Sequence, residues 1–473
     1  MSFTQNVYER LPLSLQNVAV SAYGWYWKRL RLGGVFESRL NDWRERESWN
    51  DERLHGWQVR RLREVLCTAW DSTEFYRPFW TPHGATRSHL EKFELEDLER
   101  LPVVGKENLR TSPGCNWRGG PGSREVGFVR STSGSTGTPL RVGFSREVFQ
   151  DIYGAVEARS YNWAGVSIRE SRSMLGSRPI VPASQNGPPF WRYNMFERQV
   201  YLSGLHLSSS SVGDYADALN RFRPVTMTGY ASAQSILAGL LEAAGLEVHS
   251  PRAVIATSDA LDDKMKMTLE SVFRAQVHQS WGLVENCAFA TTCEHGRLHV
   301  HPDFGIVEVL GEDNSRAAPG ETGRLVVTGL TNTTSLFIRY DTGDLGAWSG
   351  APCPCGRGTF PVLAEIVGRV EDVVVGANDV RLRRFDRVFT DFPSIRRAQV
   401  IQESRELVRV LLEADPDYEN RFSGQISARM RDLLGAMRIE VEKVDSIPLT
   451  AGGKFRAVIS RISEGGEYQS SME

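Results

Sequence analysis

The sequence contains no long hydrophobic run. No stretch approaches the ~18 consecutive apolar residues of a membrane-spanning helix, and the first residues lack the pattern of a secretory signal. An aromatic and basic segment, residues 25–29, is assigned to one face of an amphipathic helix in preference to a membrane-surface contact. We therefore expect a cytoplasmic protein with no membrane partner.

Net charge is also almost absent. The 473 residues include 56 Lys and Arg against 58 Asp and Glu, a formal charge of −2. Dedicated nucleic-acid-binding proteins carry a marked positive excess, so we expect no nucleic-acid partner. The length suits roughly two to four domains with a substantial core.

Cysteine is scarce, and its placement is informative. Six cysteines in 473 residues do not make a disulfide framework, yet Cys287, Cys293, Cys353 and Cys355 fall in one third of the chain. In a reducing compartment such clustering favours a metal site. A Cys and a His six residues apart, with two cysteines one residue apart, can supply four ligands for tetrahedral Zn²⁺. The alternative is a set of reduced, packed thiols.

The organisation of the chain indicates an α/β protein. Residues 1–110 are mainly helical in pattern, whereas from about residue 125 short apolar runs alternate with helical segments, which predicts a mainly parallel sheet. The expected strands include 225–227, 253–256, 306–310, 325–327 and 373–375.

A domain boundary is predicted between residues 368 and 369. The ~105 residues that follow contain short strands, a helix near 419–436 and a Gly-containing turn at 450–453, enough for a small domain. We expect a large α/β N-terminal domain of several subdomains, residues 1–368 with a helical lead-in over 1–110. A small mobile α+β C-terminal domain would span 369–473.

A loop rich in hydroxyls and glycine occupies residues 131–139, Ser-Thr-Ser-Gly-Ser-Thr-Gly-Thr-Pro. Glycine permits close backbone approach and hydroxyls donate hydrogen bonds, so the loop can wrap phosphate oxygens. It is not a Walker loop, because no Lys-Ser or Lys-Thr follows the second glycine. A flexible linker is the alternative, but a linker does not explain the strand-like residues 140–144 that follow.

Three further motifs supply a ring and charged groups. Residues 280–285, Ser-Trp-Gly-Leu-Val-Glu, combine an aromatic ring that can line a purine with a carboxylate suited to Mg²⁺. The alternative interpretation is a buried Trp and a solvated Glu without a ligand. Residues 339–344, Arg-Tyr-Asp-Thr-Gly-Asp, include a carboxylate that can accept hydrogen bonds from ribose hydroxyls. The alternative interpretation is an Asp-rich surface turn. The Gly-Gly-Lys turn at 452–454 presents an ammonium suited to developing negative charge, or an exposed lysine.

Together with Gly-Arg at 368–369, these motifs resemble in order and spacing the adenylate-forming superfamily of acyl-CoA synthetases and adenylation domains, over about residues 100–460. The chain is most similar to the phenylacetate–CoA ligase branch and its capsular-polysaccharide-biosynthesis relatives. That similarity rests on residues 15–21, 101–106 and 228–233 and on the cysteine pattern.

The resemblance implies an ATP site. The hydroxyl-rich loop would bind the phosphates, residues 257–260 would border adenine with Trp281, which stands where the family commonly has Tyr, and Asp344 and Arg369 would hold the ribose. The implied nucleotide-binding residues are Ser131, Thr132, Ser133, Gly134, Ser135, Thr136, Gly137, Ser258, Asp259, Ala260, Trp281, Gly282, Asp344 and Arg369.

The resemblance also implies catalytic and hinge residues. Lys454 would bridge the carboxylate and the α-phosphate, Glu285 would hold Mg²⁺, and Thr136 would act with them. Glu371 falls at the hinge of the small domain. Tyr230 and Gly229 would line the acyl pocket.

Two further assignments follow from the same resemblance. His206 is either a neighbour of the substrate carboxylate or a core histidine. The zinc ligands would be Cys293, His299, Cys353 and Cys355, with His295 and His301 in reserve, and four protein ligands would make the site structural.

The implied reaction joins a small-molecule carboxylic acid to AMP and then moves the acyl group to an acceptor. The segment after the hinge, residues 373–380, is shorter than is usual in the family. The acceptor is therefore left open between coenzyme A, a carrier-protein thiol and an amine. The alternatives are a nucleotidyltransferase that leaves AMP on its acceptor and a non-catalytic nucleotide-binding relative.

Overall fold

The computed structural model divides the chain into two compact units. The larger contains Met1–Thr342 and Gly346–Ile366, and the smaller contains Gly343–Leu345 and Val367–Glu473. The described residues are 7–132, 139–176, 180–182, 184–259, 261–369, 374–377, 381–382, 385–389, 392, 394–414, 418–419, 421–448 and 456–462.

The described part of the predicted lead-in, residues 7–110, is mainly helical, as expected. Asn50 caps the longest of these helices, because its side chain accepts a hydrogen bond from the Arg53 amide (3.0 Å). None of the helices in the described ranges is long and apolar enough to cross a membrane. The helices are α2 (Leu13–Leu32), α3 (Phe36–Arg46), α4 (Asp51–Ser72), α5 (Tyr76–Trp80), α6 (Arg87–Leu90) and α7 (Lys106–Arg110).

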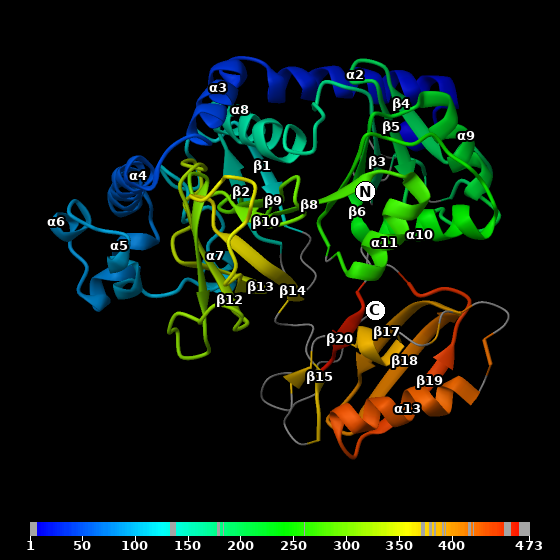
Figure 1. Cartoon of the computed structure of the whole chain (residues 1–473). Coiled ribbons are helices and arrows are strands. Elements are labelled where there is room, and N and C mark those ends of the chain that lie inside the picture. The colour runs from blue at the N-terminus through cyan, green and yellow to red at the C-terminus, as the bar shows by residue number, and fades with distance from the viewer. Residues whose placement is uncertain are drawn as a thin grey trace. The chain divides into compact units, whose positions relative to one another are not determined.

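A twelve-stranded sheet runs through the larger unit in the order β11-β12-β13-β14-β10-β9-β8-β7-β6-β3-β5-β4 (Figure 1). Its strands β8, β7, β6, β3 and β5 are parallel to one another, whereas β4 and β9 pair antiparallel with this core. The strands are β3 (Arg172–Gly176), β4 (Trp191–Asn194), β5 (Gln199–Ser203), β6 (Thr226–Tyr230), β7 (Ala253–Thr257), β8 (Gln276–Gly282), β9 (Phe289–Thr292), β10 (Leu298–Val300), β11 (Gly305–Leu310), β12 (Gly323–Gly329), β13 (Tyr340–Trp348) and β14 (Val362–Arg369).

Helices and a hairpin complete the larger unit. α9, α10 and α11 bury their apolar faces against the parallel strands around Leu175, Met227 and Val254. A two-stranded hairpin, β1 with β2, precedes α8, which continues into a buried π-helical turn, Glu157–Tyr161. The bounds are β1 (Phe128–Ser131), β2 (Arg141–Phe144), α8 (Arg146–Val156), α9 (Val212–Phe222), α10 (Ala231–Ala243) and α11 (Asp263–Phe273).

The smaller unit is an α+β domain, as predicted. A four-stranded sheet of order β19-β18-β17-β20 is covered by α13, whose Ile426, Met430 and Leu434 are buried against it. The helix expected near 419–436 is confirmed as α13. The elements are β15 (Val374–Val375), β16 (Arg381–Leu382), α12 (Asp386–Phe389), β17 (Ile395–Gln402), β18 (Leu407–Ala414), α13 (Arg421–Leu434), β19 (Arg438–Lys443) and β20 (Val458–Ser460).

The parallel strands β3 and β6 pack closely at Gly229, so a substitution there tests this strand contact. A Cβ atom at Gly229 would lie 2.1 Å from the carbonyl oxygen of Leu175 on β3, whereas one at Gly239 on α10 would meet nothing within 4 Å. We expect Gly229→Ala to lower the free energy of unfolding of the larger unit by about 2 kcal/mol or more through overpacking. Gly239→Ala should raise it by about 0.5–1 kcal/mol, because alanine has the higher helix propensity.

Urea denaturation followed by tryptophan fluorescence measures both changes. All 12 tryptophans lie between residues 25 and 348, so this signal reports the larger unit alone. Equal stability of Gly229→Ala and the wild-type chain would contradict the close strand contact.

Candidate active site and metal site

Many of the predicted site residues follow the carboxyl ends of adjacent parallel strands. Tyr230 ends β6 and pairs with Thr257 at the end of β7, and Thr257 pairs with Ser280 near the end of β8. β5 ends at Ser203, three residues before His206. Ligands of open α/β sheets bind outside this edge. The strand register therefore gathers the segments 229–230, 258–259 and 281–282 at one edge of the sheet.

Asp259 has a structural contact at this edge. Its carboxylate accepts hydrogen bonds from the backbone amides of Ala231 (2.6 Å) and Ser232 (3.2 Å), the first two residues of α10. A carboxylate at a helix N-terminus satisfies unpaired amides and complements the helix dipole. Ser258 has a φ of +73°, which turns the chain sharply after β7. The predicted adenine contact of this segment stays a prediction.

The Mg²⁺ candidate Glu285 is held by a residue of a distant motif. Its side chain is buried, and its Oε1 accepts a hydrogen bond of 2.9 Å from the hydroxyl of Tyr340, which is also buried. Among the described residues, no other donor reaches this carboxylate, so Oε2 is available to a cation. Asn332 also donates to the Glu285 backbone carbonyl (3.2 Å). The 280–285 and 339–344 motifs thus meet in the fold.

The other two predicted residues of these motifs are also largely buried. Trp281 lies in β8 opposite Ala290 of β9 and is 8% exposed. It is therefore a buried Trp, as the alternative interpretation of this motif expected. Asp344 lies in β13 and is 9% exposed, which excludes the alternative of a surface turn. A carboxylate this far from solvent needs a partner or a ligand.

The hydroxyl-rich loop connects the two strands of a hairpin. Ser131 ends β1 and pairs with Arg141 of β2. Thr132 closes the base of the loop, because its amide donates to the Leu140 carbonyl and its hydroxyl accepts from the Leu140 amide, both at 3.0 Å. The residues that flank the loop are thus paired with each other, which disfavours the flexible-linker alternative.

His206 is half-buried and has protein contacts. Its Nδ1 lies 2.7 Å from the hydroxyl of Ser203, and its ring stacks on Phe190 with centroids 4.9 Å apart. These contacts resemble those of a core histidine. The position after β5 is also compatible with a pocket residue, so both interpretations stay open.

Several predicted residues lie outside the description. They are Ser133, Gly134, Ser135, Thr136, Gly137, Ala260, Glu371, Lys454 and the side chain of Arg369.

The chain on both sides of the lysine turn is anchored within the smaller unit. Glu413 accepts a hydrogen bond from the Ile447 amide (2.6 Å), and Gln399 donates one to the Arg456 carbonyl (2.7 Å). These two side chains belong to the adjacent strands β18 and β17, so both ends of the turn are attached to one sheet.

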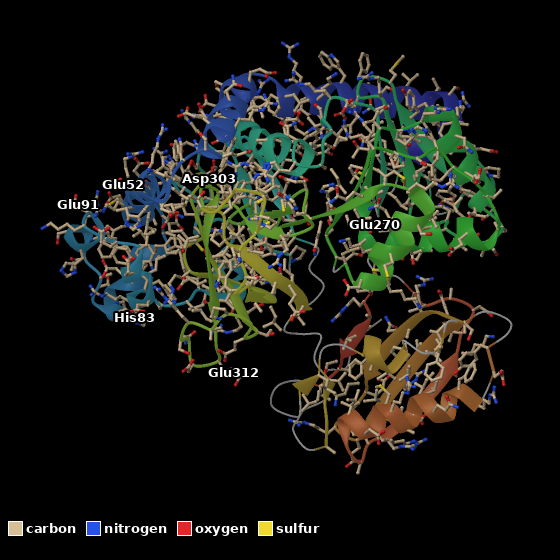
Figure 2. All side chains as sticks on the ribbon, viewed as in Figure 1. Glu52, His83, Glu91, Glu270, Asp303 and Glu312 are labelled. Atoms are coloured by element: carbon tan, nitrogen blue, oxygen red, sulfur yellow. The ribbon has the colours of Figure 1, made fainter. Side chains whose placement is uncertain are left out.

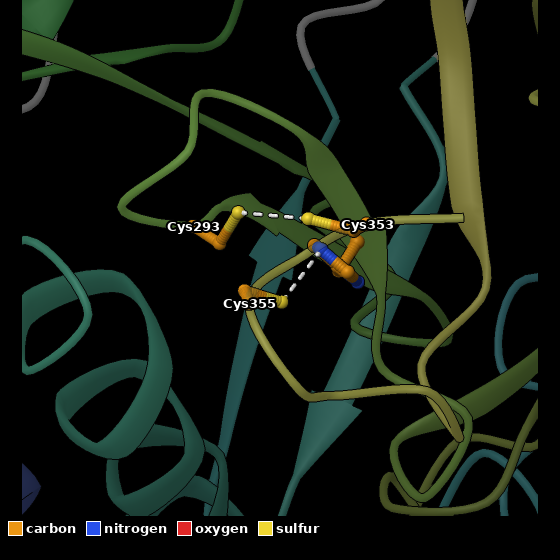
Figure 3. Close-up of side chains that lie close together, drawn as sticks. Cys293, Cys353 and Cys355 are labelled. Atoms are coloured by element: carbon orange, nitrogen blue, oxygen red, sulfur yellow. Dashed lines mark hydrogen bonds between the residues drawn. The ribbon is translucent and has the colours of Figure 1, made fainter. Parts of the chain in front are cut away.

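The four predicted zinc ligands converge. Their ligand atoms all lie within 4.8 Å of one another, although 60 residues separate Cys293 from Cys353. The Cys293 and Cys353 sulfurs are 3.6 Å apart, and the Cys355 sulfur is 3.4 Å from His299 Nε2 (Figure 3). A tetrahedral ion with ordinary Zn–S and Zn–N bonds places two sulfurs about 3.8 Å apart and a sulfur about 3.5 Å from a nitrogen. The cluster fits zinc in ligand type and size.

The surroundings orient these ligands. His299 donates from Nδ1 to the Phe360 carbonyl (2.8 Å), which leaves the Nε2 lone pair for a metal. Burial raises the pKa of the Cys353 thiol to about 11. Burial acts in the same direction on Cys355, but hydrogen bonds from Arg357 outweigh it and hold the pKa of that thiol below its usual value. Arg357 itself pairs with Glu294 (2.7 Å).

The reserve ligand His301 has another role. It is buried, its Nδ1 accepts from Arg159 (3.0 Å), and its Nε2 donates to the hydroxyl of Thr291 (3.0 Å). Burial and the nearby guanidinium of Arg159 hold its pKa well below the ordinary histidine value, so the ring stays neutral. Both ring nitrogens are occupied, which removes His301 from the zinc ligands.

A buried ion pair next to His301 is not predicted from any sequence motif. Arg159, in the π-helical turn, donates to both oxygens of Asp303 (3.3 and 3.0 Å), and both side chains are fully buried. Asp303 is labelled in Figure 2. In the same turn, the hydroxyl of Ser160 lies 2.6 Å from that of Ser280, next to Trp281. π-Helical turns often occur at functional sites. The partners are more than 100 residues apart, so no local signal in the sequence reveals them.

Comparison with known proteins identifies similar chains. Residues 376–461 match the CapK C-terminal domain family. Protein CapK of Staphylococcus aureus is 24% identical over 472 residues, covering 96% of this chain and 99% of CapK. The phenylacetate-coenzyme A ligase of Thermus thermophilus is 24% identical over 468 residues, covering 88% of this chain and 98% of the ligase.

A solved structure shares the fold. The 2-hydroxyisobutyryl-CoA ligase in its postadenylation state superposes with a TM-score of 0.67 at 22% identity, covering 85% of this chain and 88% of that one. These similarities confirm the predicted resemblance to the adenylate-forming superfamily and the predicted fold class.

The metal site yields a direct prediction. We expect the purified full-length chain to contain about one equivalent of zinc, and Cys353→Ser/Cys355→Ser to lose it, because two of four ligands are removed. Elemental analysis measures the metal content, and thermal unfolding measures the accompanying loss of stability. Cys67→Ser is the matched control, since Cys67 lies outside the cluster. Less than about half an equivalent in the wild-type chain would contradict the assignment.

Proposed function

We propose that this chain, a homologue of CapK and the phenylacetate-coenzyme A ligases, is an ATP-dependent adenylate-forming ligase. Its substrate would be a small-molecule carboxylic acid and its acceptor the thiol of coenzyme A. The observation that carries the proposal is the buried contact between Glu285 and Tyr340, which joins the candidate Mg²⁺ ligand to the motif that contains Asp344. Similarity over nearly the whole chain supports it.

The proposed reaction has two steps. In the first, a carboxylate oxygen of the acid attacks the α-phosphorus of ATP. The bond from that phosphorus to the oxygen that bridges the α- and β-phosphates breaks, pyrophosphate departs, and the acyl-adenylate is formed. In the second, the thiol loses its proton and its sulfur attacks the acyl carbon, which releases AMP and forms a thioester. Most of the protein's contribution is positioning and neutralisation of charge.

The residues divide this work by charge. Mg²⁺, when bound, neutralises phosphate oxygens, and Glu285 would hold it through Oε2. The amides and hydroxyls of the loop after Thr132 would bind phosphate oxygens, and Lys454 would meet the negative charge that develops on the α-phosphate. The Asp344 carboxylate would accept hydrogen bonds from the ribose hydroxyls, and Arg369 would donate to ribose oxygens. The loop and Lys454 lie outside the described residues, so their roles rest on the motifs.

The acyl pocket would lie at the carboxyl edge of the parallel strands. Tyr230 stands at this edge, where an added Cβ on Gly176 of β3 would come 3.9 Å from the Tyr230 ring. Gly229 permits the close approach of β3 and β6 beneath it. An aromatic ring over small residues is suited to a compact acyl group. A carrier-protein thiol or an amine is the alternative acceptor, and coenzyme A is preferred because similar chains are coenzyme A ligases.

The function is tested by carboxylate-dependent exchange of pyrophosphate into ATP. Across a panel of aryl, hydroxy and amino acids, we expect at least one acid to stimulate exchange by the wild-type chain. Lys454→Ala should lower the exchange rate on the order of 10²-fold or more, as losses of single charge-stabilising donors do. ATP binding without exchange for any acid would contradict the proposal, and AMP that stays on the acceptor would indicate a nucleotidyltransferase.

Tyr340 is expected to act as a positioning residue for Glu285. Tyr340→Phe removes the hydroxyl that holds Oε1, and hydrogen bonds to charged groups contribute about 1.5–3 kcal/mol. We therefore expect the Mg²⁺ concentration for half-maximal exchange to rise roughly tenfold, with the KM for the acid unchanged. Initial rates across a Mg²⁺ titration measure this shift.

Tyr76→Phe is the matched control. Tyr76 is equally buried, and its hydroxyl donates to the Leu336 carbonyl (2.9 Å) and accepts from the Ile338 amide (3.0 Å), so its hydrogen bonds go to backbone groups and not to Glu285. This variant should lose stability but keep the wild-type Mg²⁺ dependence. Similar Mg²⁺ shifts in both variants would show that the effect on Tyr340→Phe is only structural.

A further inference from the structure

Over residues 13–26, α2 buries polar and small residues, whereas Trp27, Leu30 and Leu32 farther along the helix pack against the hydrophobic core. Its buried residues are Gln16, Ser21 and Gly24. The exposed side chains of the same helix include apolar and aromatic ones, among them Val18, 63% exposed, Trp25, 49%, and Tyr26, 56%. Leu15, Val18, Ala22, Trp25 and Tyr26 recur at three- and four-residue spacing, so they share one helix face. Surface helices ordinarily show the opposite arrangement.

The inversion has a physical cause. β4 is the edge strand of the large sheet, and its outer backbone groups need partners. Asn17 accepts from the Tyr193 amide (2.9 Å), and Ser21 donates to the Tyr193 carbonyl (3.3 Å) and accepts from the Met195 amide (3.2 Å). The polar side of α2 is therefore used to cover the sheet edge. In Figure 1, α2 is the dark blue helix beside β4.

The helix lies so close to the strand that it cannot rotate easily. A Cβ atom at Gly24 would lie 1.9 Å from the side-chain nitrogen of Asn194. Gln16 accepts from Arg192 (2.7 Å), and both side chains are buried. These contacts hold the apolar face outward.

The charged residues of α2 itself have one sign. The 20 residues of α2 contain Lys28, Arg29 and Arg31 but no Asp or Glu. Arg31 is turned inward and pairs with Glu197. Lys28 and Arg29 are exposed at the end of the apolar face, beside Trp25.

A cavity adjoins these two cations. It has a volume of about 530 Å³, and its lining includes Trp25, Lys28, Arg29, Arg146 and Phe196. Among the described residues, none of the three cations forms an ion pair, and none of the residues lining the cavity is acidic. Lys28 donates to the Phe196 carbonyl (3.0 Å), which holds its ammonium at the rim. Three cations with aromatic side chains suit a phosphate group above an apolar layer.

We infer that the outer face of α2 docks this protein on an anionic phospholipid membrane, which reverses the expectation from sequence that residues 25–29 make no membrane contact. Trp25, Tyr26 and Val18 would enter the boundary between headgroups and acyl chains. Lys28, Arg29 and Arg146 would contact lipid phosphates. Like charges on two facing copies of this surface would repel each other, which favours a membrane over a second copy of the chain. This inference is independent of the proposed ligase activity.

Co-sedimentation of the full-length chain with vesicles tests the inference. We expect binding to vesicles of phosphatidylcholine with phosphatidylglycerol and at least tenfold weaker binding to phosphatidylcholine alone, and high salt should weaken the anionic interaction. Trp25→Ala/Tyr26→Ala and Arg29→Glu/Arg146→Glu should each reduce binding at least tenfold. These side chains are exposed, so thermal unfolding should stay close to that of the wild-type chain.

Two control variants alter equally exposed side chains elsewhere. Met267→Ala on α11 removes an apolar side chain that is 64% exposed, and Arg60→Glu on α4 reverses an exposed charge. Both should bind vesicles like the wild-type chain. Absence of binding to anionic vesicles, or binding that the α2 variants leave unchanged, would overturn the inference. So would a dimer in light scattering that the same α2 variants dissociate while vesicles do not bind.

Discussion

The hydrogen-bonded register of the parallel strands is the constraint on which the candidate active site depends. β6, β7 and β8 are aligned so that Tyr230, Thr257 and Ser280 occupy one level of the sheet. Gly229 lets β3 approach β6 without a steric clash, which keeps this level intact. The residues that directly follow the three strands therefore all lie at the carboxyl edge of the sheet. A shift of one residue in any pairing would turn these side chains to the opposite face.

Buried polar groups in the larger unit are paired across long stretches of sequence. Glu285 is held by Tyr340, Arg159 by Asp303 and His301, and His299 by the Phe360 carbonyl. Each pairing offsets the cost of removing a polar or charged group from water. The pairings also explain why the two histidines of one short segment differ. His299 turns Nε2 toward the cysteines, 3.4 Å from the Cys355 sulfur, whereas both nitrogens of His301 are engaged by Arg159 and Thr291.

The edge of the same sheet accounts for the unusual surface of α2. An edge strand left open invites pairing with other chains. Here the side chains of Asn17 and Ser21 supply the missing hydrogen bonds, at the expense of leaving the apolar face in solvent. One requirement, the satisfaction of backbone groups of β4, therefore sets both the position of the helix and the chemistry that it presents outward.

The sequence by itself determined what depends on local pattern. It identified the α/β class, the helical lead-in, α13 and the apolar strands β6, β7, β11, β12 and β15. It also identified the motifs around Glu285 and Asp344 and the cysteines and histidine of the metal cluster, because residue type and short spacing suffice to recognise them. Tertiary structure alone decided which partners meet. The engagement of both His301 nitrogens, the hydroxyl of Tyr340 on Glu285 and the burial of Arg159 depend on contacts between residues from 10 to more than 100 positions apart. It also decided the orientation of α2, because hydrophobic periodicity shows that a helix has two faces but does not show which face its neighbours require.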